Sequence, residues 1–135
     1  MIIKKIQNKD DLAKLYTFIM GVNVSVGSSI LFKDYMYMYN NGIAYSILNR
    51  ENGSVIGGCL ISENSGMNEL FNLYIPENNR NAWGSMYKEI RKYVCNTTSK
   101  YVIFQLDDTT NIRNNISKFP HLGDGFYKIK MCKEQ

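Results

Sequence analysis

The chain has little of what metal centres and nucleophilic triads are built from. Its 135 residues include a single histidine, His121, and only three cysteines, Cys59, Cys95 and Cys132. One histidine excludes a multi-histidine metal site and argues against a cysteine-histidine nucleophile. The cysteines stand far apart in no metal-binding spacing, so we expect free, buried or partly buried thiols in a reducing compartment. His121 follows Pro120, and we expect it on a surface loop rather than acting as a base.

Long apolar runs are absent as well. No stretch reaches the length of a membrane span, and no apolar run of signal-peptide length stands at the start. We therefore expect a cytoplasmic protein without a membrane partner. The hydrophobic fraction of 44% and the charged fraction of 21% are typical of a globular chain. A length of 135 residues predicts one domain, 1–135, with one core.

A concentration of positive charge is also missing. The net charge is +4, and the lysines and arginines are scattered along the chain. A nucleic-acid-binding domain more often carries a dense basic stripe, so the sequence argues against a nucleic-acid partner. The mild charge would still help to attract an anionic ligand. Few prolines, many asparagines and more lysine than arginine indicate an AT-rich genome of bacterial or phage origin.

Hydrophobic spacing predicts a strand and then a helix at the N-terminus. Residues 2–6 form the strand, Asn8 before two aspartates marks the helix start, and apolar residues recur at helical spacing as far as Gly21. Residues 22–29 are predicted to form a loop. Residues 30–39 fit two patterns, because their tyrosines and methionines alternate as in a strand but also share one helical face.

Strand patterns dominate the middle of the chain. Residues 43–48 and 54–62 are rich in β-branched and aromatic residues, and a hairpin loop at 49–53 separates them. A second loop at 63–67 leads to a strand at 68–75. These three strands predict an antiparallel meander.

The last third of the sequence predicts one long helix, a buried strand, a short helix and a final strand. From residue 81 onward, the buried face of a helix is marked by Trp83, Met86, Tyr87, Ile90 and Val94. Residues 101–106 are almost continuously apolar, as expected of a strand parallel to its predecessor. Thr109 or Thr110 can cap a short helix that ends at Ile116, and residues 126–131 alternate as a final strand.

The turn between the fourth strand and the long helix is the most informative segment. It runs from Pro76-Glu77 to Gly84-Ser85, where the helix is predicted to open. The N–H groups of a first helical turn lack internal partners, and the helix dipole adds positive charge there, so an anion is favoured. Gly84 would let the backbone approach such a ligand closely. An ordinary strand-to-helix connection is the alternative.

This segment resembles the central signature of the GNAT family of acyl-CoA-dependent N-acetyltransferases. That signature is a strand, Pro-Glu, Arg/Gln-x-x-Gly-x-Gly/Ala and a helix; Asn79 takes the Arg/Gln position, Ala82 the first glycine and Gly84 the second. The family has two helices between its first two strands, so the resemblance implies a helix at 30–39. The chain then follows the family order β-α-α-β-β-β-α-β-α-β, an α/β (α+β) fold with a mixed central sheet and a cleft between the fourth and fifth strands.

The resemblance implies acetyl-CoA as a cosubstrate, with no metal. The pantetheine arm would lie in the cleft beside Leu73, Tyr74 and Ile75. The pyrophosphate would meet the backbone of Asn79, Arg80, Asn81, Ala82, Trp83, Gly84 and Ser85. Asn111 begins the family's Asn-x-x-Ala-x-x-x-Tyr pattern, and Lys118 occupies its tyrosine position, where the side chain is expected to contact coenzyme phosphate or solvent.

Acetyl transfer to an amine needs a base, a donor to the thioester carbonyl and an acid. Glu69 on the fourth strand is the first choice of base and Glu63 the second, with an exposed structural carboxylate as the alternative for both. The implied carbonyl donor is the backbone N–H near Ile75. Because Lys118 replaces the usual tyrosine, Tyr127 on the last strand is the candidate acid, and a core tyrosine is the alternative.

Three functions stay open at this point. The first is transfer of an acetyl group from acetyl-CoA to an amine of a small molecule or protein. The second is a GNAT-fold binding protein without catalysis, in which the tyrosines and methionines of residues 35–39 serve a partner. The third is a small α/β interaction module. A homodimer is kept open as the assembly.

Overall fold

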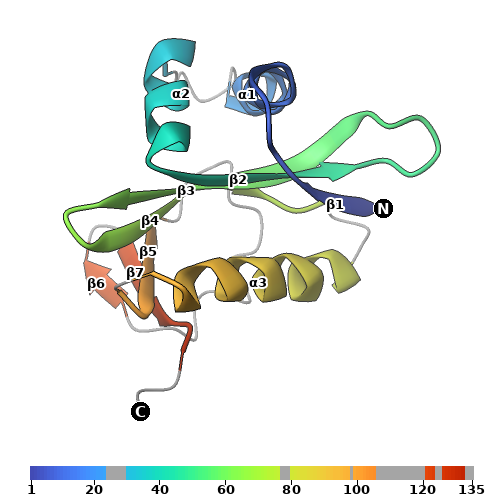
Figure 1. The fold of residues 1–135 in the computed structure, drawn as a ribbon. Helices are drawn as coiled ribbons and strands as arrows, with labels where there is room; N and C mark the ends of the chain where they lie inside the picture. Colours follow the sequence, from blue (N-terminus) through green and yellow to red (C-terminus); the bar gives the residue numbers. More distant parts are fainter. Residues whose placement is uncertain (24–29, 77–79, 98, 106–120, 124–125, 133–135) are drawn as a thin grey trace.

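One mixed sheet with helices on both faces forms the centre of the protein. The structure, a computed structural model, describes residues 1–23, 30–76, 80–97, 99–105, 121–123 and 126–132. Its elements are β1 (Ile2–Lys5), α1 (Lys9–Asn23), α2 (Phe32–Asn40), β2 (Gly42–Leu48), β3 (Val55–Asn64), β4 (Met67–Tyr74), α3 (Arg80–Cys95), β5 (Tyr101–Gln105), β6 (His121–Gly123) and β7 (Phe126–Lys130). Figure 1 shows α1 and α2 on one face of the sheet and α3 on the other.

The sheet has the strand order β1-β2-β3-β4-β5-β7-β6. β1, β2, β3 and β4 pair antiparallel with their neighbours in the chain, which confirms the predicted meander. β4 and β5 pair parallel, because α3 carries the chain back between them. The α/β class with a mixed central sheet is therefore confirmed. No helix in the described part of the chain combines the length and the apolar character that crossing a membrane needs.

Local sequence signals explain the N-terminal helices. Asn8 caps α1, since its Oδ1 accepts a hydrogen bond of 2.8 Å from the backbone N–H of Asp11. The ambiguous segment 30–39 is helical from Phe32 onward, as the resemblance implied. Within it Tyr35 is fully buried and Tyr37 is 70% exposed, so the tyrosines divide between the core and the solvent around a helix.

Two predictions concern the C-terminal third of the chain. His121 was expected in a loop, but it opens β6, which pairs antiparallel with β7. Three residues with a glycine carry too little periodicity to reveal such a strand from sequence. The short helix expected from Thr109 or Thr110 to Ile116 lies outside the described residues, as does most of the loop expected at 22–29.

Strand alternation divides the core into two clusters. Ile47 and Ile61 face α3 and pack in one cluster with Met86 of that helix. Ala44, three residues before Ile47 on β2, and Leu60, the neighbour of Ile61 on β3, belong to the cluster beneath α1 and α2. Both clusters are fully buried at their centres, and each buried aliphatic side chain contributes about 1.5–3 kcal/mol to folding.

A disulfide joins the end of α3 to the segment after β7. Cys95 and Cys132 are bonded, with Cα atoms 5.6 Å apart, which corrects the expectation that they are free thiols. Their separation of 37 residues hid this contact, because only the pairing of β7 with β5 brings the two ends together. Among the described cysteines Cys59 is free, and burial raises the pKa of its thiol to about 12. The argument from free thiols for a reducing compartment therefore no longer holds.

A buried asparagine holds β4 to the start of β5 beside this disulfide. The Nδ2 of Asn68 donates to the Oγ1 of Thr97 at 2.8 Å and lies 3.4 Å and 3.3 Å from the carbonyl oxygens of Ser99 and Tyr101. The ammonium of Lys100 donates to the carbonyl oxygen of Cys95, the last residue of α3, and to that of Thr97, two residues beyond the helix. These polar contacts close the end of the β4–β5 pair at which both strands begin.

Reduction of the disulfide should lower the free energy of unfolding by about 3 kcal/mol, because the bond closes a loop of intermediate length in the unfolded chain. Urea unfolding with and without dithiothreitol measures the effect. Cys59→Ser should respond to the reductant as the wild type does, whereas a Cys95→Ser/Cys132→Ser variant should not. Equal midpoints for the wild type in both conditions, or three reactive thiols in unreduced denatured protein, would contradict the disulfide.

Candidate functional site

The described pairing of the parallel strands β4 and β5 ends halfway along β4. Their register pairs Asn68 with Val102, Glu69 with Ile103 and Leu70 with Phe104, and there it ends. β4 itself continues to Tyr74, paired on its other side with β3. Within the described residues, which end at Gln105 on β5, the sheet is therefore forked beyond Leu70. The family resemblance implied a cleft between the fourth and fifth strands at this position.

A β-bulge in β4 accompanies the fork. β3 pairs Leu60 with Phe71 but Gly58 with Tyr74, so two residues of β4 oppose one of β3. Asn72 stands in this bulge with φ +53°, a left-handed conformation that asparagine tolerates better than most residues. Gly58 of β3 pairs with Tyr74 just beyond the bulge, and a Cβ on Gly58 would collide with the carbonyl oxygen of Tyr45 on β2. Only glycine fits that approach.

The bulge changes which side chains share a face of the sheet. Phe71 and Tyr74, three residues apart, both pack with the cluster beneath α1 and α2, whereas Leu73 faces α3. The Tyr74 ring meets Phe18 of α1 edge-on, with centroids 5.4 Å apart. Of the residues expected beside a pantetheine arm, Leu73 and Ile75 are buried and Tyr74 is half-buried.

The two candidate bases lie on opposite faces. Glu69 is half-buried at the root of the fork, one residue before the last β4–β5 pair, and it shares the α1/α2 face with Phe71. Glu63 lies on the α3 face, where its carboxylate, after burial, contributes to raising the pKa of Tyr93. The geometry favours Glu69, since Glu63 is beside the C-terminal half of α3 and away from the fork.

Helix α3 begins earlier than the sequence predicted. It starts at Arg80, so Gly84 and Ser85 lie one turn inside the helix and not at its opening. By the general pattern of helix starts, the N–H groups without intrahelical partners are those of its first residues, Arg80 to Ala82. Gly84 is exposed, and a Cβ added there would meet nothing within 4 Å. The early start also makes Ala82 part of the core, at 4% exposure.

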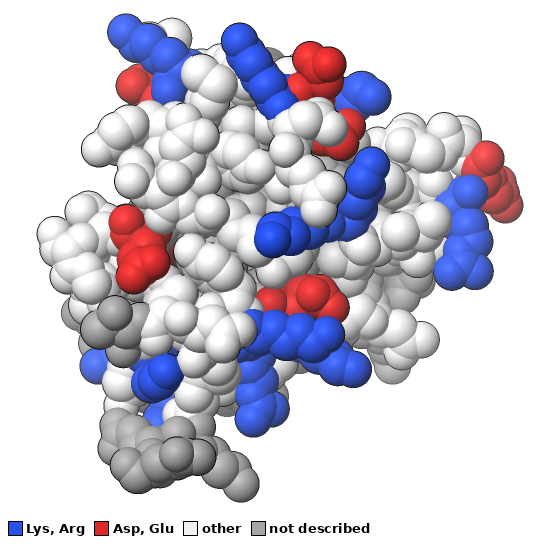
Figure 2. Space-filling view, viewed as in Figure 1, with Lys and Arg blue, Asp and Glu red and all other residues white. Residues whose placement is uncertain are grey.

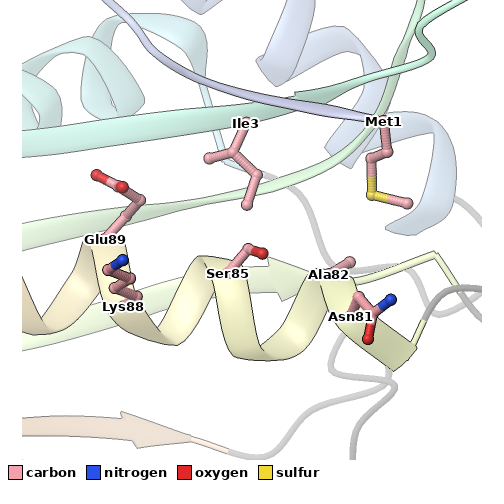
Figure 3. Close-up of a pocket in the computed structure, with 7 residues that line it drawn as sticks. All are labelled: Met1, Ile3, Asn81, Ala82, Ser85, Lys88 and Glu89. Carbon is pink, nitrogen blue, oxygen red and sulfur yellow. The ribbon is translucent and has the colours of Figure 1, made fainter.

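The remaining side chains of the first turns of α3 divide between its sides. Trp83 is half-buried and stacks against Tyr87 at 5.8 Å between centroids. A cavity of about 400 Å³ lies on the side of α3 that faces β1, lined by Met1, Ile3, Asn81, Ala82, Ser85, Lys88 and Glu89. Figure 3 shows Met1 and Ile3 above it and the helix residues below. This cavity is under the edge strand, three strands from β4, so it is separate from the fork.

Several of the expected site residues lie partly or wholly outside the described part of the chain. Asn79, Asn111 and Lys118 lie outside the described residues, and for Arg80 the backbone alone is described. The backbone of Tyr127 pairs with Phe104, the residue that also pairs with Leu70. Tyr127 is thus in line with the last rung before the fork.

In Figure 2 the basic and acidic side chains are interspersed on the visible face, and no basic stripe runs across it. Within the described part of the chain, no group of three or more histidine, cysteine, aspartate or glutamate side chains is arranged to hold a metal ion.

Sequence reasoning missed three features of this site. The bulge at Asn72 had only the asparagine itself as a signal, and Phe18 could not be assigned to Tyr74 because the contact joins distant segments. The third is Lys128, whose ammonium lies 4.0 Å from the ring centroid of Tyr101 on the neighbouring strand. Strand register alone reveals that these two residues are neighbours.

Comparison with known proteins identifies the fold. The sequence matches no family model and no curated protein. Solved structures similar to this chain include a GNAT-family acetyltransferase from Staphylococcus aureus Mu50, 16% identical over 97% of this chain and 100% of that chain, with a TM-score of 0.68. An N-acetyltransferase from the same organism is 12% identical over 98% and 100% of the two chains, with a TM-score of 0.64.

A third similar structure contains a ligand. It is a GNAT-family acetyltransferase from Brucella melitensis in complex with acetyl-CoA, 12% identical over 99% of this chain and 91% of that chain, with a TM-score of 0.53. The similarity extends over nearly the whole chain in all three cases. The protein therefore has the fold of the GNAT acetyltransferases.

Proposed function

We propose that this protein transfers an acetyl group from acetyl-CoA to an amine. The observation that carries the proposal is the fork beyond Leu70, where, among the described residues, β4 runs on without β5 toward the start of α3. A strand with one open side next to a helix N-terminus suits an extended ligand with an anionic end. The fold shared with acetyltransferases, one of them solved with acetyl-CoA, supports the same assignment.

The chain offers a fitting place for each part of the coenzyme. The pantetheine arm would extend beside Leu73 and Tyr74, on the side of β4 that β5 leaves. The pyrophosphate would accept hydrogen bonds from the first N–H groups of α3, between Arg80 and Ala82. Gly84 keeps the exposed side of the next turn free of a side chain, and the net charge of +4 favours an anionic ligand.

Glu69 would act as the base. It stands at the root of the fork, so an amine that reaches the thioester carbon from the α1/α2 face meets its carboxylate. Glu69 takes the ammonium proton, the amine nitrogen bonds to the carbonyl carbon and then gives its second proton to water, and the carbon–sulfur bond breaks. The leaving thiolate needs a proton, and we assign its donation to Tyr127, whose backbone lies on the last rung before the fork.

A binding protein without catalysis is the second candidate. Lys118 replaces the tyrosine of the family pattern. Two large apolar side chains are exposed at α2, namely Leu31 at its N-cap, 62% exposed, and Tyr37 within it, 70% exposed. Such residues suit a protein partner. Turnover of acetyl-CoA with any amine decides between the two candidates.

Acetyl-CoA should raise the melting temperature. At a hundredfold excess over Kd the native state gains about 2.7 kcal/mol, which corresponds to roughly 8 °C for a chain of this size. Gly84→Glu should abolish the rise, because its carboxylate opposes the pyrophosphate, while Gly84→Gln controls for bulk. A full rise in Gly84→Glu, measured by calorimetry, would place the coenzyme elsewhere.

Gly84→Ala should stabilise the free protein by about 0.5–1 kcal/mol, because the residue is exposed inside a helix and its new Cβ meets no other atom. Urea unfolding measures this change. Gly58→Ala is the contrasting variant and should destabilise, since its Cβ would collide with the Tyr45 carbonyl. A loss of stability in Gly84→Ala would mean that the helix does not begin at Arg80.

Glu69→Gln should lower kcat by about 10²–10⁴-fold, the usual contribution of a general base, while the thermal shift with acetyl-CoA is kept. The reaction rate is measured from the release of the coenzyme A thiol. Glu63→Gln is the matched control, and its kcat should stay close to that of the wild type because Glu63 is on the other face. Unchanged turnover in Glu69→Gln would remove Glu69 as the base.

A further inference from the structure

Glu69 and Lys128 stand in one lateral row of the sheet. Glu69 of β4 is in register with Ile103 of β5, and Ile103 is in register with Lys128 of β7. Residues in register project from the same face of a sheet. The row therefore places a carboxylate and an ammonium on the α1/α2 face, with an apolar residue between them, one rung before the fork.

Neither charge has an ionic partner among the described residues. In that part of the chain Lys4 pairs with Asp11 and Lys92 with Glu89, and these pairs include neither Glu69 nor Lys128. Both of these side chains are half-buried. A partly desolvated charge without an oppositely charged group beside it is unfavourable, and a ligand that carries the opposite charge removes that cost.

Lys128 is also held in place. Its Nζ lies 4.0 Å from the centroid of the Tyr101 ring, a cation–π contact that keeps the ammonium close to the sheet. A lysine on an open surface would more often extend into water. The ring leaves the other sides of the ammonium able to donate hydrogen bonds to an anion.

The strand spacing sets the distance that a ligand would bridge. Neighbouring strands lie about 4.8 Å apart, so the Cα atoms of residues two strands apart are separated by roughly 9.6 Å. Each ionic contact spans about 3 Å between heavy atoms. The charges of a bridging ligand are therefore about 3.6 Å apart if both contacts lie along the sheet and about 9.6 Å apart if both lie above the side chains. The nitrogen and carboxylate oxygens of an α-amino acid are at or below the lower end of this range, whereas a chain of four or five carbons spans its middle.

We propose that the acceptor is an ω-amino acid, a primary amine with a carboxylate at the other end of a short aliphatic chain. The amine lies at Glu69, the carboxylate at Lys128 and the chain over Ile103. Lys128 supplies a single positive charge, which suits the single negative charge of a carboxylate better than the two charges of a dianion such as phosphate. This inference rests on the proposed acetyl transfer, in which Glu69 receives the amine, and it adds Lys128 as the residue that determines acceptor specificity.

The test compares two homologous series of acceptors at saturating acetyl-CoA. One series runs from glycine through 3-aminopropanoate, 4-aminobutanoate and 5-aminopentanoate to 6-aminohexanoate, and the other contains the alkylamines of the same chain lengths. We expect kcat/KM to peak at the four- or five-carbon amino acid and there to exceed that of the matched alkylamine about tenfold or more, as a charged hydrogen bond does.

Lys128→Met should reduce this ratio to near one, mainly through a higher KM for the amino acid. Lys130→Met is the matched control, because Lys130 is in register with Tyr101, two residues further from the fork along β7. The ratio of kcat/KM values in this variant should equal that of the wild type. A retained thermal shift with acetyl-CoA shows that each variant is folded.

The outcomes separate the two proposals. Absence of turnover with every amine, together with no thermal shift, overturns the acetyl transfer and this inference with it. Turnover that is equally efficient with alkylamines and amino acids, or a preference that survives Lys128→Met, overturns the acceptor assignment alone.

Discussion

The end of the β4–β5 ladder is the constraint on which the rest of the structure depends. Parallel strands are held together by regular hydrogen bonds, and a fork between them persists only where something prevents further pairing. Here the bulge around Asn72 turns the end of β4, and Gly57 of β3 permits the close approach of β4, because a Cβ on Gly57 would collide with the carbonyl oxygen of Tyr74. The same bulge directs Phe71 and Tyr74 to one face. The opening and the lining of the site therefore have a common cause.

The opposite end of the same strand pair is closed by polar and covalent contacts. Asn68 holds β4 to the connection between α3 and β5, and the Cys95–Cys132 disulfide fixes the end of α3 to the segment after β7. A fork needs such a closed base, because strands that could shift in register would move Glu69 relative to β7. The stable end thereby positions the residues at the functional end.

Much of the fold could be predicted from the sequence, because hydrophobic periodicity is local. The meander, α3 and the parallel β5 all follow from it, whereas α2 needed the family resemblance because residues 30–39 satisfy two periods. Features that join distant segments could not be found in this way, as the disulfide and the row from Glu69 to Lys128 show. Candidate residues such as Glu69 could be named from the sequence. Which of them project from the same face of the sheet depends on the strand register, which cannot be read from one sequence alone.

The geometry also explains why a weakened signature is compatible with coenzyme binding. A glycine in an anion-binding turn matters where its Cβ would stand between the backbone and the ligand. Ala82 departs from the family's first glycine, yet its methyl group is buried against the core and points away from the exposed side of α3. Gly84 keeps the second glycine, and its Cβ position is open. The departure thus falls at a buried position, so it does not count against the proposed contact of the coenzyme with the first N–H groups of α3.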